Sequence, residues 1–449
     1  MNYNTFLDRI FSIRISNKTF IIIAAVTISF LSVELLLSNI SLATSVSSYE
    51  NIVIFVLVAI MFIVGQHLIF AFLRNNTRTV VNKSTSISLL AKAIIPFQYF
   101  LVAIILFIIF QMLVESRYST WLLTLGTLLG YSIGASVMGL LCLRFFLWYK
   151  SSKNFALLLY GLATATITIR LLITLVFFTT LLLTATPERT PSSDVFYQEF
   201  EEESPVALLN YSYTASSSVG LLLMWISTVI LLRDYYSRSW SIKYWIIVAI
   251  IPIYSLSDYF ITDEVVAGSI GFDTVNYYIF ITFQGIVAGI LLSIPFWAMG
   301  ANLRTNSVSL GDYMSIAALG IILFFMASSL SIDHAPYPPF GFILLSSIGL
   351  SAYMIMTGVY SSAVAVSIDT ELRRFIRIST EDRMKLIDTI GLAEVNRGVQ
   401  TKVEELSEKL IQESGIESSL DDQQIRDYIA EVVEELERTK FRKGEGLSK

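Results

Sequence analysis

The sequence is poor in charge and in the residues that build most catalytic and metal sites. Only 15% of its 449 residues are Asp, Glu, Lys or Arg, against roughly 25% in a soluble domain. It has one cysteine, Cys142, and two histidines. One cysteine excludes an intrachain disulfide and a thiolate metal cluster, and Cys142 lies in an apolar run where a small buried side chain is typical. The sequence contains no HExxH, GxSxG or Walker lysine motif and no paired aspartates of an intramembrane protease, so it predicts no enzyme, no cofactor and no metal site.

Long apolar runs stand where a soluble protein would have charge, and 54% of the residues are hydrophobic. About ten runs reach the ~20 residues that a bilayer-spanning helix needs. The first run continues to Ile40, which is too long for a signal-peptide core of ~7–15 residues. The expected spans are 20–40, 52–73, 93–114, 120–143, 155–185, 214–232, 244–261, 275–299, 313–332 and 341–367. The sequence therefore predicts an all-α polytopic transmembrane bundle whose solvent is the lipid bilayer.

The basic residues lie almost entirely in alternate connections between these runs. If the N-terminus is inside, the inner connections contain Arg74, Arg78, Lys83, Arg144, Lys150, Lys153, Arg233, Arg238, Lys243 and Arg304. The outer connections contain many acids but only Arg117 and Arg189 as bases. Because positive connections stay on the side of synthesis, we expect a multi-pass protein of the cell membrane with both termini in the cytoplasm.

Three regions follow from this threading: a cytoplasmic N-terminus at 1–19, the bundle at 20–367 and a polar tail at 368–449. An acidic outer loop at 187–213 contains the run FYQEFEEESP. A solvated loop is the simpler interpretation of its glutamates, and a cation site is the alternative. No basic patch indicates a nucleic-acid partner.

Arg170 and Glu34 are charged residues deep inside predicted spans. Arg170 lies in the run ATATITIRLLITL, where a guanidinium costs from ~2.5 to more than 10 kcal/mol unless it is relieved. Thr166 and Thr174 flank Arg170 by one turn on each side, so this face of the helix is polar. Glu34 and Arg170 lie ~21 and ~22 Å from the inner ends of their spans at 1.5 Å per residue. We expect them to pair, either as a polar midplane site for an ion or a conformational latch, or as a structural ion pair.

Two further features concern how the predicted spans contact one another. Gly126, Gly130 and Gly134 are spaced four apart, as are Gly285 and Gly289, so each set lines one helix face and lets another backbone approach, within the chain or in a second copy. His67 lies inside the second span, where it either relays protons or makes a hydrogen bond to a neighbouring helix.

The tail begins directly after the last span, where Arg373, Arg374 and Arg377 mark the cytoplasmic rim. Apolar residues then recur every three or four positions in two segments, 381–413 and 420–438, which predicts a helical hairpin of coiled-coil-like helices. Two such helices bury too little apolar surface to be stable alone. We expect them to pack on a second copy (a homo-oligomer), on a cytoplasmic protein or on the inner face of the bundle.

The juxtamembrane pattern SIDTELRRFIR followed by KLIDTIGLAE resembles the tails of multi-spanning membrane proteins of ammonia-oxidising archaea. That group has no assigned activity to carry over, so the resemblance implies an archaeal cell membrane and nothing further.

Two functions fit these observations. The first is a membrane-embedded sensor or scaffold, in which the last span transmits a change in the bundle to the tail. The second is a secondary transporter with a polar midplane site around Arg170 and Glu34, which would require a water-filled path to Arg170.

Overall fold

The computed structural model describes most of the chain. The residues described are 17–43, 49–81, 85–184, 187–190, 205–236, 245, 248–253, 274–304, 307–329, 337–369, 371–373, 376 and 385–414. The helices are α2 (Asn17–Ala43), α3 (Tyr49–Val81), α4 (Thr85–Glu115), α5 (Thr120–Ser152), α6 (Phe155–Thr184), α7 (Pro205–Tyr236), α10 (Thr274–Leu303), α11 (Val308–Ser328), α12 (Phe342–Ile368) and α14 (Lys385–Ser414). Two short strands, β1 (Tyr118–Ser119) and β2 (Glu188–Arg189), are also present.

The predicted all-α polytopic bundle is confirmed. Among the described residues, nine helices are long and apolar enough to cross a membrane. They correspond to nine of the ten expected spans. The remaining span, 244–261, lies mostly outside the described residues, although 248–253 is helical. Residues 1–16 and most of the acidic loop also lie outside them.

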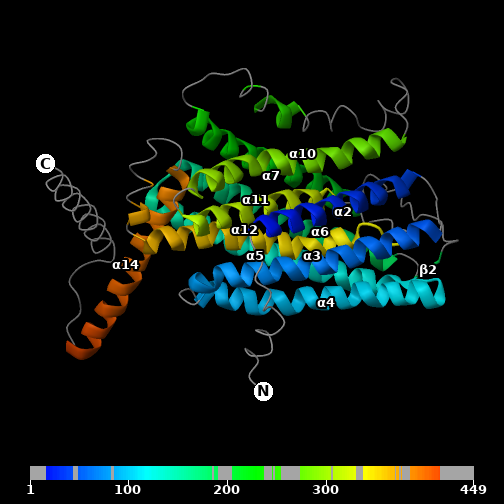
Figure 1. The fold of residues 1–449 in the computed structure, drawn as a ribbon, viewed down its shortest axis with the longest axis horizontal. Helices are drawn as coiled ribbons and strands as arrows, with labels where there is room; N and C mark the ends of the chain where they lie inside the picture. The colour runs from blue at the N-terminus through cyan, green and yellow to red at the C-terminus, as the bar shows by residue number, and fades with distance from the viewer. Residues whose placement is uncertain are drawn as a thin grey trace.

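The helices form a core surrounded by a more exposed ring (Figure 1). The most apolar 18-residue stretch of α12 is entirely buried, and 94% of the corresponding stretch of α11 is buried. In α7 and α2 the buried share falls to 28% and 33%. The exposed side chains of these outer helices are large and apolar, including Ile22, Leu208 and Val219. This distribution is expected for a bundle whose outer surface contacts lipid, because lipid imposes no requirement for a polar exterior.

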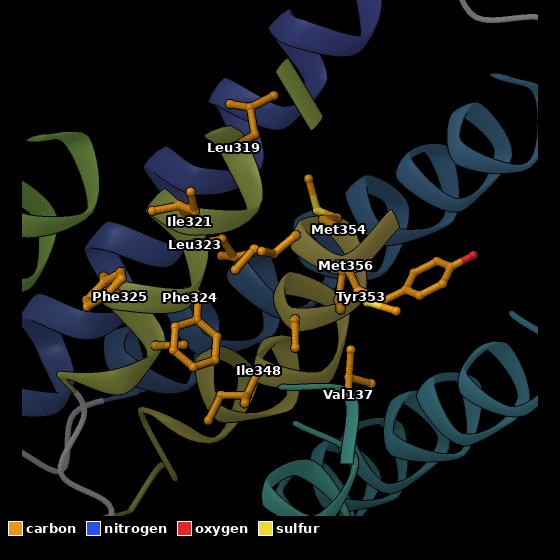
Figure 2. Packing of buried hydrophobic residues seen from close by; sticks show 14 of the residues in the cluster. Val137, Leu319, Ile321, Leu323, Phe324, Phe325, Ile348, Tyr353, Met354 and Met356 are labelled. Carbon is orange, nitrogen blue, oxygen red and sulfur yellow. The ribbon is translucent and has the colours of Figure 1, made fainter. Parts of the chain in front are cut away.

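The central helix α12 is rich in small polar residues as well as apolar ones. Ser346, Ser347 and Ser351 are fully buried, and their hydroxyls donate to backbone carbonyls three residues earlier. A hydroxyl that is satisfied by its own helix needs no outside partner. Small side chains also let neighbouring helices approach closely. Figure 2 shows the apolar part of this packing, where α11, α12 and α5 meet.

The two ends of the bundle differ, and we name them by what lies there. The tail end carries α14, and the strand end carries β1 and β2 (Figure 1). The strands pair antiparallel, with Tyr118 opposite Arg189. They tie the α4–α5 turn to the segment after α6. The Tyr118 ring stacks on Tyr337 with centroids 6.0 Å apart, and burial raises the pKa of Tyr118.

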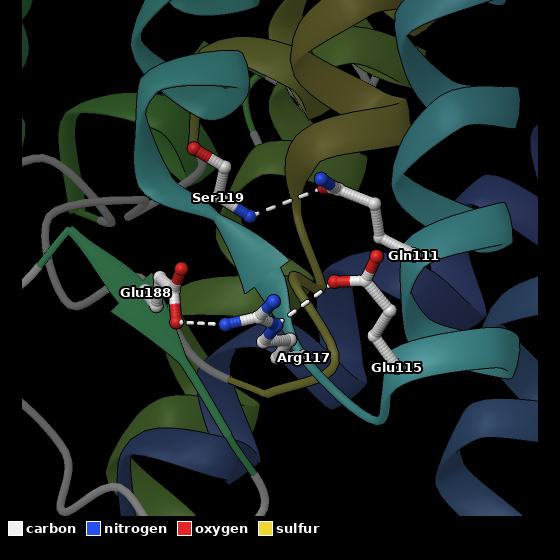
Figure 3. A network of polar contacts seen from close by, with 5 residues as sticks. All are labelled: Gln111, Glu115, Arg117, Ser119 and Glu188. Atoms are coloured by element: carbon white, nitrogen blue, oxygen red, sulfur yellow. Dashed lines mark hydrogen bonds and ion pairs between the residues drawn. The ribbon is translucent and has the colours of Figure 1, made fainter.

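Arg117, one of the two bases expected in outer connections, lies in an exposed polar network at the strand end (Figure 3). Its guanidinium pairs with Glu115 at 2.8 Å and Glu188 at 2.6 Å. The hydrogen bonds to Glu115 and then Glu188 raise the pKa of Arg117. Arg189 is buried, with 3% of its surface exposed. Neither base therefore presents a bare positive charge to solvent at this end.

The first tail helix packs on the bundle. Leu386, Ile387, Ile390 and Ala393 of α14 are buried, and α14 crosses α12 so closely at Gly391 that a Cβ there would collide with Val366. The later turns of α14 run away from the bundle (Figure 1). Packing on the bundle was one of three arrangements predicted for this helix. The second predicted tail helix, 420–438, lies outside the described residues.

Candidate functional site

Glu34 lies at the start of α12, where it supplies a helix cap from another element. Its side chain is fully buried. Oε1 accepts hydrogen bonds from the backbone N–H groups of Gly341 at 2.9 Å and Ile343 at 3.0 Å. These are amides of the first helical turn, which have no partner within a helix. The N-cap position is Gly341, with φ 93°, and a glycine offers no side-chain oxygen for capping. Glu34 replaces that missing acceptor, and in its ionised form its charge complements the positive end of the helix dipole.

Arg170 makes the complementary arrangement at the end of α11. Its Nη2 donates to the carbonyl of Ser328, the last residue of α11, and to the Tyr213 hydroxyl at 3.1 Å. The guanidinium carbon lies 5.0 Å from the centroid of the Tyr213 ring. The last carbonyls of a helix lack intrahelical partners and carry partial negative charge. The cation is therefore held by a helix end and an aromatic face.

The threonines that flank Arg170 do not contact its guanidinium. Thr174 Oγ1 donates to the backbone carbonyl of Arg170, and Thr166 Oγ1 donates to that of Leu162. Both hydroxyls are thus satisfied within α6. The polar face that the sequence indicates is real, but it serves the helix backbone.

The structure does not bring Arg170 and Glu34 together, and this corrects the expected pairing. Among the described residues, neither side chain forms an ion pair. Their similar depth along parallel helices made a pair reasonable. Each charge instead meets the end of a different helix, and these two helices follow one another in the chain. The end of α11 lies within reach of Arg170, and the start of α12 lies within reach of Glu34.

Two buried glutamines and a half-buried His67–Tyr99 pair lie on α3 and α4, and one of the glutamines contacts the first turns of α12. Gln98 Nε2 donates to the carbonyl of Ser346 and, at 3.2 Å, to Gln66 Oε1. His67 and Tyr99, each one residue further along, are joined at 2.8 Å between Nδ1 and the hydroxyl. His67 therefore makes a hydrogen bond between α3 and α4, which is the second of the two roles considered for it.

The glycine faces lie against helices of the same chain. A Cβ at Gly130 would come 2.9 Å from Leu345, and one at Gly134 would come 2.5 Å from Ile348. Gly126 faces the ring of Phe342 in the same way, so this face of α5 receives the first half of α12. In α10, Gly289 faces the backbone of Ile322 and Gly285 faces Ser329. Both sets allow close helix packing inside the bundle.

A second polar junction joins the other end of α12 to α14. Glu394 accepts from Trp148 Nε1 at 2.9 Å and from the Tyr360 hydroxyl at 3.3 Å. The guanidinium of Arg144 lies 4.7 Å from the Tyr360 ring centroid. We name Trp148, Tyr360 and Glu394 the tail latch. Sequence analysis missed it, although a glutamate beside the apolar stripe of 381–413 was a signal that could have been followed.

The rim between α12 and α14 is only partly described. Asp369 Oδ1 accepts from the amides of Glu371 and Leu372, at 3.0 Å each, and Arg373 lies in the turn that this cap starts. Arg374 and Arg377 lie outside the described residues. Within the described part of the chain, no three His, Cys, Asp or Glu side chains are grouped as a metal site would require.

One small cavity lies among α5, α6, α7, α10, α11 and α12. Its volume is about 20 Å³, which is room for roughly one water molecule. The lining is mostly apolar, with Tyr160 and Thr164 as its polar side chains, and Arg170 is not part of it.

The chain matches no known protein family, no curated protein and no solved structure at the level that would establish a relationship. Its family is therefore not identified.

Proposed function

We propose that the protein is a non-enzymatic, membrane-embedded sensor or scaffold in which α12 couples the bundle to the tail. We place it in an archaeal cell membrane with both termini in the cytoplasm, where the tail meets a cytoplasmic protein or a second copy. One observation carries the proposal: the same buried helix is held at its start by Glu34 and bears Tyr360 of the tail latch near its end.

α12 is fixed at its two ends and packed along its length. Both ends are fixed by a few hydrogen bonds between groups that are largely removed from water, where each bond matters more than at the surface. Between them, α12 packs against the glycine face of α5 with side chains that interdigitate. A tightly packed helix moves as a unit, since cores switch between discrete arrangements and do not deform continuously. A shift at the Glu34 end is thus expected to reach Tyr360 and Glu394.

A distance measurement across the tail latch tests this coupling. Cys142 is replaced by Ser, and spin labels are placed at Lys150 and Lys402, which are exposed on α5 and α14. In lipid nanodiscs, Glu34→Ala is expected to lengthen and broaden the distance distribution. Glu50→Gln, at an exposed glutamate in the first turn of α3, is the control and leaves it unchanged. A wild-type distribution in folded Glu34→Ala protein would show that α12 does not couple the two ends.

A secondary transporter is the second candidate, and one observation favours it. α11 ends beside the cationic side chain of Arg170, and α12, the next helix, begins beside the acidic side chain of Glu34. The discontinuous helices of transporters also place their ends beside charged groups. Against it, both helix ends are occupied by side chains of the chain itself. Thr166→Cys in the Cys142→Ser background, treated with a water-soluble thiol reagent, separates the two. Labelling from one side of the membrane would indicate a water path to Arg170 and support transport, whereas protection supports the sensor or scaffold.

A further inference from the structure

Glu34 combines three features that are rarely found together in a carboxyl group. It is fully buried, its partners are backbone amides, and its second oxygen, Oε2, has no hydrogen-bond partner among the described residues. An ionised carboxyl group in an apolar interior is unfavourable unless a cation or enough donors stabilise it. The two amides supply part of that stabilisation at Oε1, and the backbone amide of Leu344 also acts on the carboxyl group, but Oε2 itself accepts no hydrogen bond from the described residues.

The elements around Glu34 bring it no charged partner. α12 contributes amides, α3 contributes Phe55, which packs on Phe340, and α11 contributes Met326, which contacts Ser32. The titratable side chains described on the neighbouring elements make no hydrogen bond or ion pair with Glu34: Lys18 on α2, Glu50, His67 and Arg74 on α3, Asp312 and Tyr313 on α11, and Tyr337, Tyr353 and Tyr360 before or on α12.

We propose that Glu34 is a proton-binding site, and that its protonation state sets how firmly the first turn of α12 is held. The proton adds to Oε2, because Oε1 is occupied by the two amides, and the carboxylate becomes a neutral carboxylic acid. Ser38, one turn further along the same face of α2, contacts the Phe340 carbonyl at 3.4 Å and lies between Glu34 and the strand end.

The consequence for α12 follows from the hydrogen bonds. In the ionised form the amides of Gly341 and Ile343 bond to a charged acceptor, and such bonds are shorter and stronger than neutral ones. The negative charge also lies at the positive end of the α12 dipole. Protonation weakens both effects while removing an unfavourable buried charge. The inference rests on the proposed coupling: the ionised form keeps α12 seated and α14 docked, and the protonated form releases them.

Infrared spectroscopy reads the proton directly. The carbonyl stretching band of a protonated carboxyl group is followed against pH in nanodiscs for the wild type, Glu34→Gln, Glu34→Asp and Asp312→Asn. Asp312 is the matched control because it is also buried but is paired with Arg304 at 3.1 Å. We expect a titrating band that disappears in Glu34→Gln and persists in the other two variants. Absence of the band in the wild type, or its persistence in Glu34→Gln, overturns the proton site.

The spin-label distance between positions 150 and 402 reads the consequence in the same samples. Acidification is expected to increase the long-distance population of the wild type, and Glu34→Gln is expected to show that population at every pH. Glu394 is itself ionisable, so Glu394→Gln serves as a second control and must retain the pH response of the Glu34 band. A band that titrates without any change in distance supports the proton site and overturns the coupling of the proposed function. A pH-dependent distance that survives Glu34→Gln overturns the assignment to Glu34.

Discussion

Glu34 and Arg170 are ionisable groups of opposite sign inside the bundle, and each lies at the helix end whose partial charge is opposite to that of its ionised form. They differ in what surrounds them. Glu34 is fully buried and has backbone amides as its partners, whereas Arg170 is half-buried and shares its guanidinium between a carbonyl and an aromatic ring. The comparison shows that a charge inside a membrane protein needs no counter-ion when a helix terminus is within reach. It also predicts that substitution of Glu34, the more buried residue, lowers the stability of the protein more than substitution of Arg170 does.

The largest effect is expected from Glu34→Ala. It removes the acceptor of two buried amides, and each buried donor left without a partner costs about 1–3 kcal/mol. We expect a loss of about 3 kcal/mol in the free energy of unfolding, measured by denaturant titration in bicelles. Glu34→Gln is the control, because its amide oxygen still accepts from Gly341 and Ile343, and it should lose less than half as much. Equal losses in the two variants would show that the charge, and not the acceptor, holds α12.

Arg170→Leu should have a smaller effect. The change removes charge-assisted hydrogen bonds but also removes the penalty of a partly buried guanidinium, so we expect a net loss of about 1–2 kcal/mol. Tyr213→Phe keeps the ring and removes only the hydroxyl, and it should cost about 0.5 kcal/mol. The same unfolding measurement applies. A loss larger than that of Glu34→Ala would show that stability depends more on Arg170 than on Glu34. Unchanged folding and activity would exclude a functional role for Arg170.

Glu394→Gln should act locally at the other end of α12. The substitution retains an acceptor for Trp148 and Tyr360 but removes its charge, so global stability should fall by less than about 1 kcal/mol. We expect faster amide hydrogen exchange in residues 386–394 of α14, measured by mass spectrometry, with the amides of α11 unchanged as an internal control. Unchanged exchange in that segment would mean that apolar packing alone docks α14.

The smallest effect is expected from Arg117→Gln at the strand end. Exposed ion pairs contribute about 0–1 kcal/mol and are screened by salt. We expect the thermal midpoint to remain within experimental error of the wild type, at low and at high ionic strength. A clear destabilisation would indicate that β1 and β2 depend on this network. Arg117 would then contribute to stability as Arg170 is expected to do.

Much of the architecture was predictable because lipid imposes simple rules. Length and hydrophobicity alone located nine of the helices, and the absence of charge in 341–367 marked a span whose most apolar 18-residue stretch is entirely buried. The same reasoning identified Arg170 and Glu34 as costly residues that need partners. It paired them wrongly, because sequence gives a depth along each helix but not the lateral position or the place where a neighbouring helix ends.

The composition and order of the chain therefore determined that it forms a helical membrane bundle, where its spans lie and which charges need relief, since these depend on transfer of each segment between water and lipid. Only the tertiary structure decided that Glu34 caps α12, that Arg170 closes α11, and that Glu394 latches α14 to Trp148 and Tyr360. Those contacts join residues tens to hundreds of positions apart, and they depend on how helices pack side by side, which no local pattern encodes.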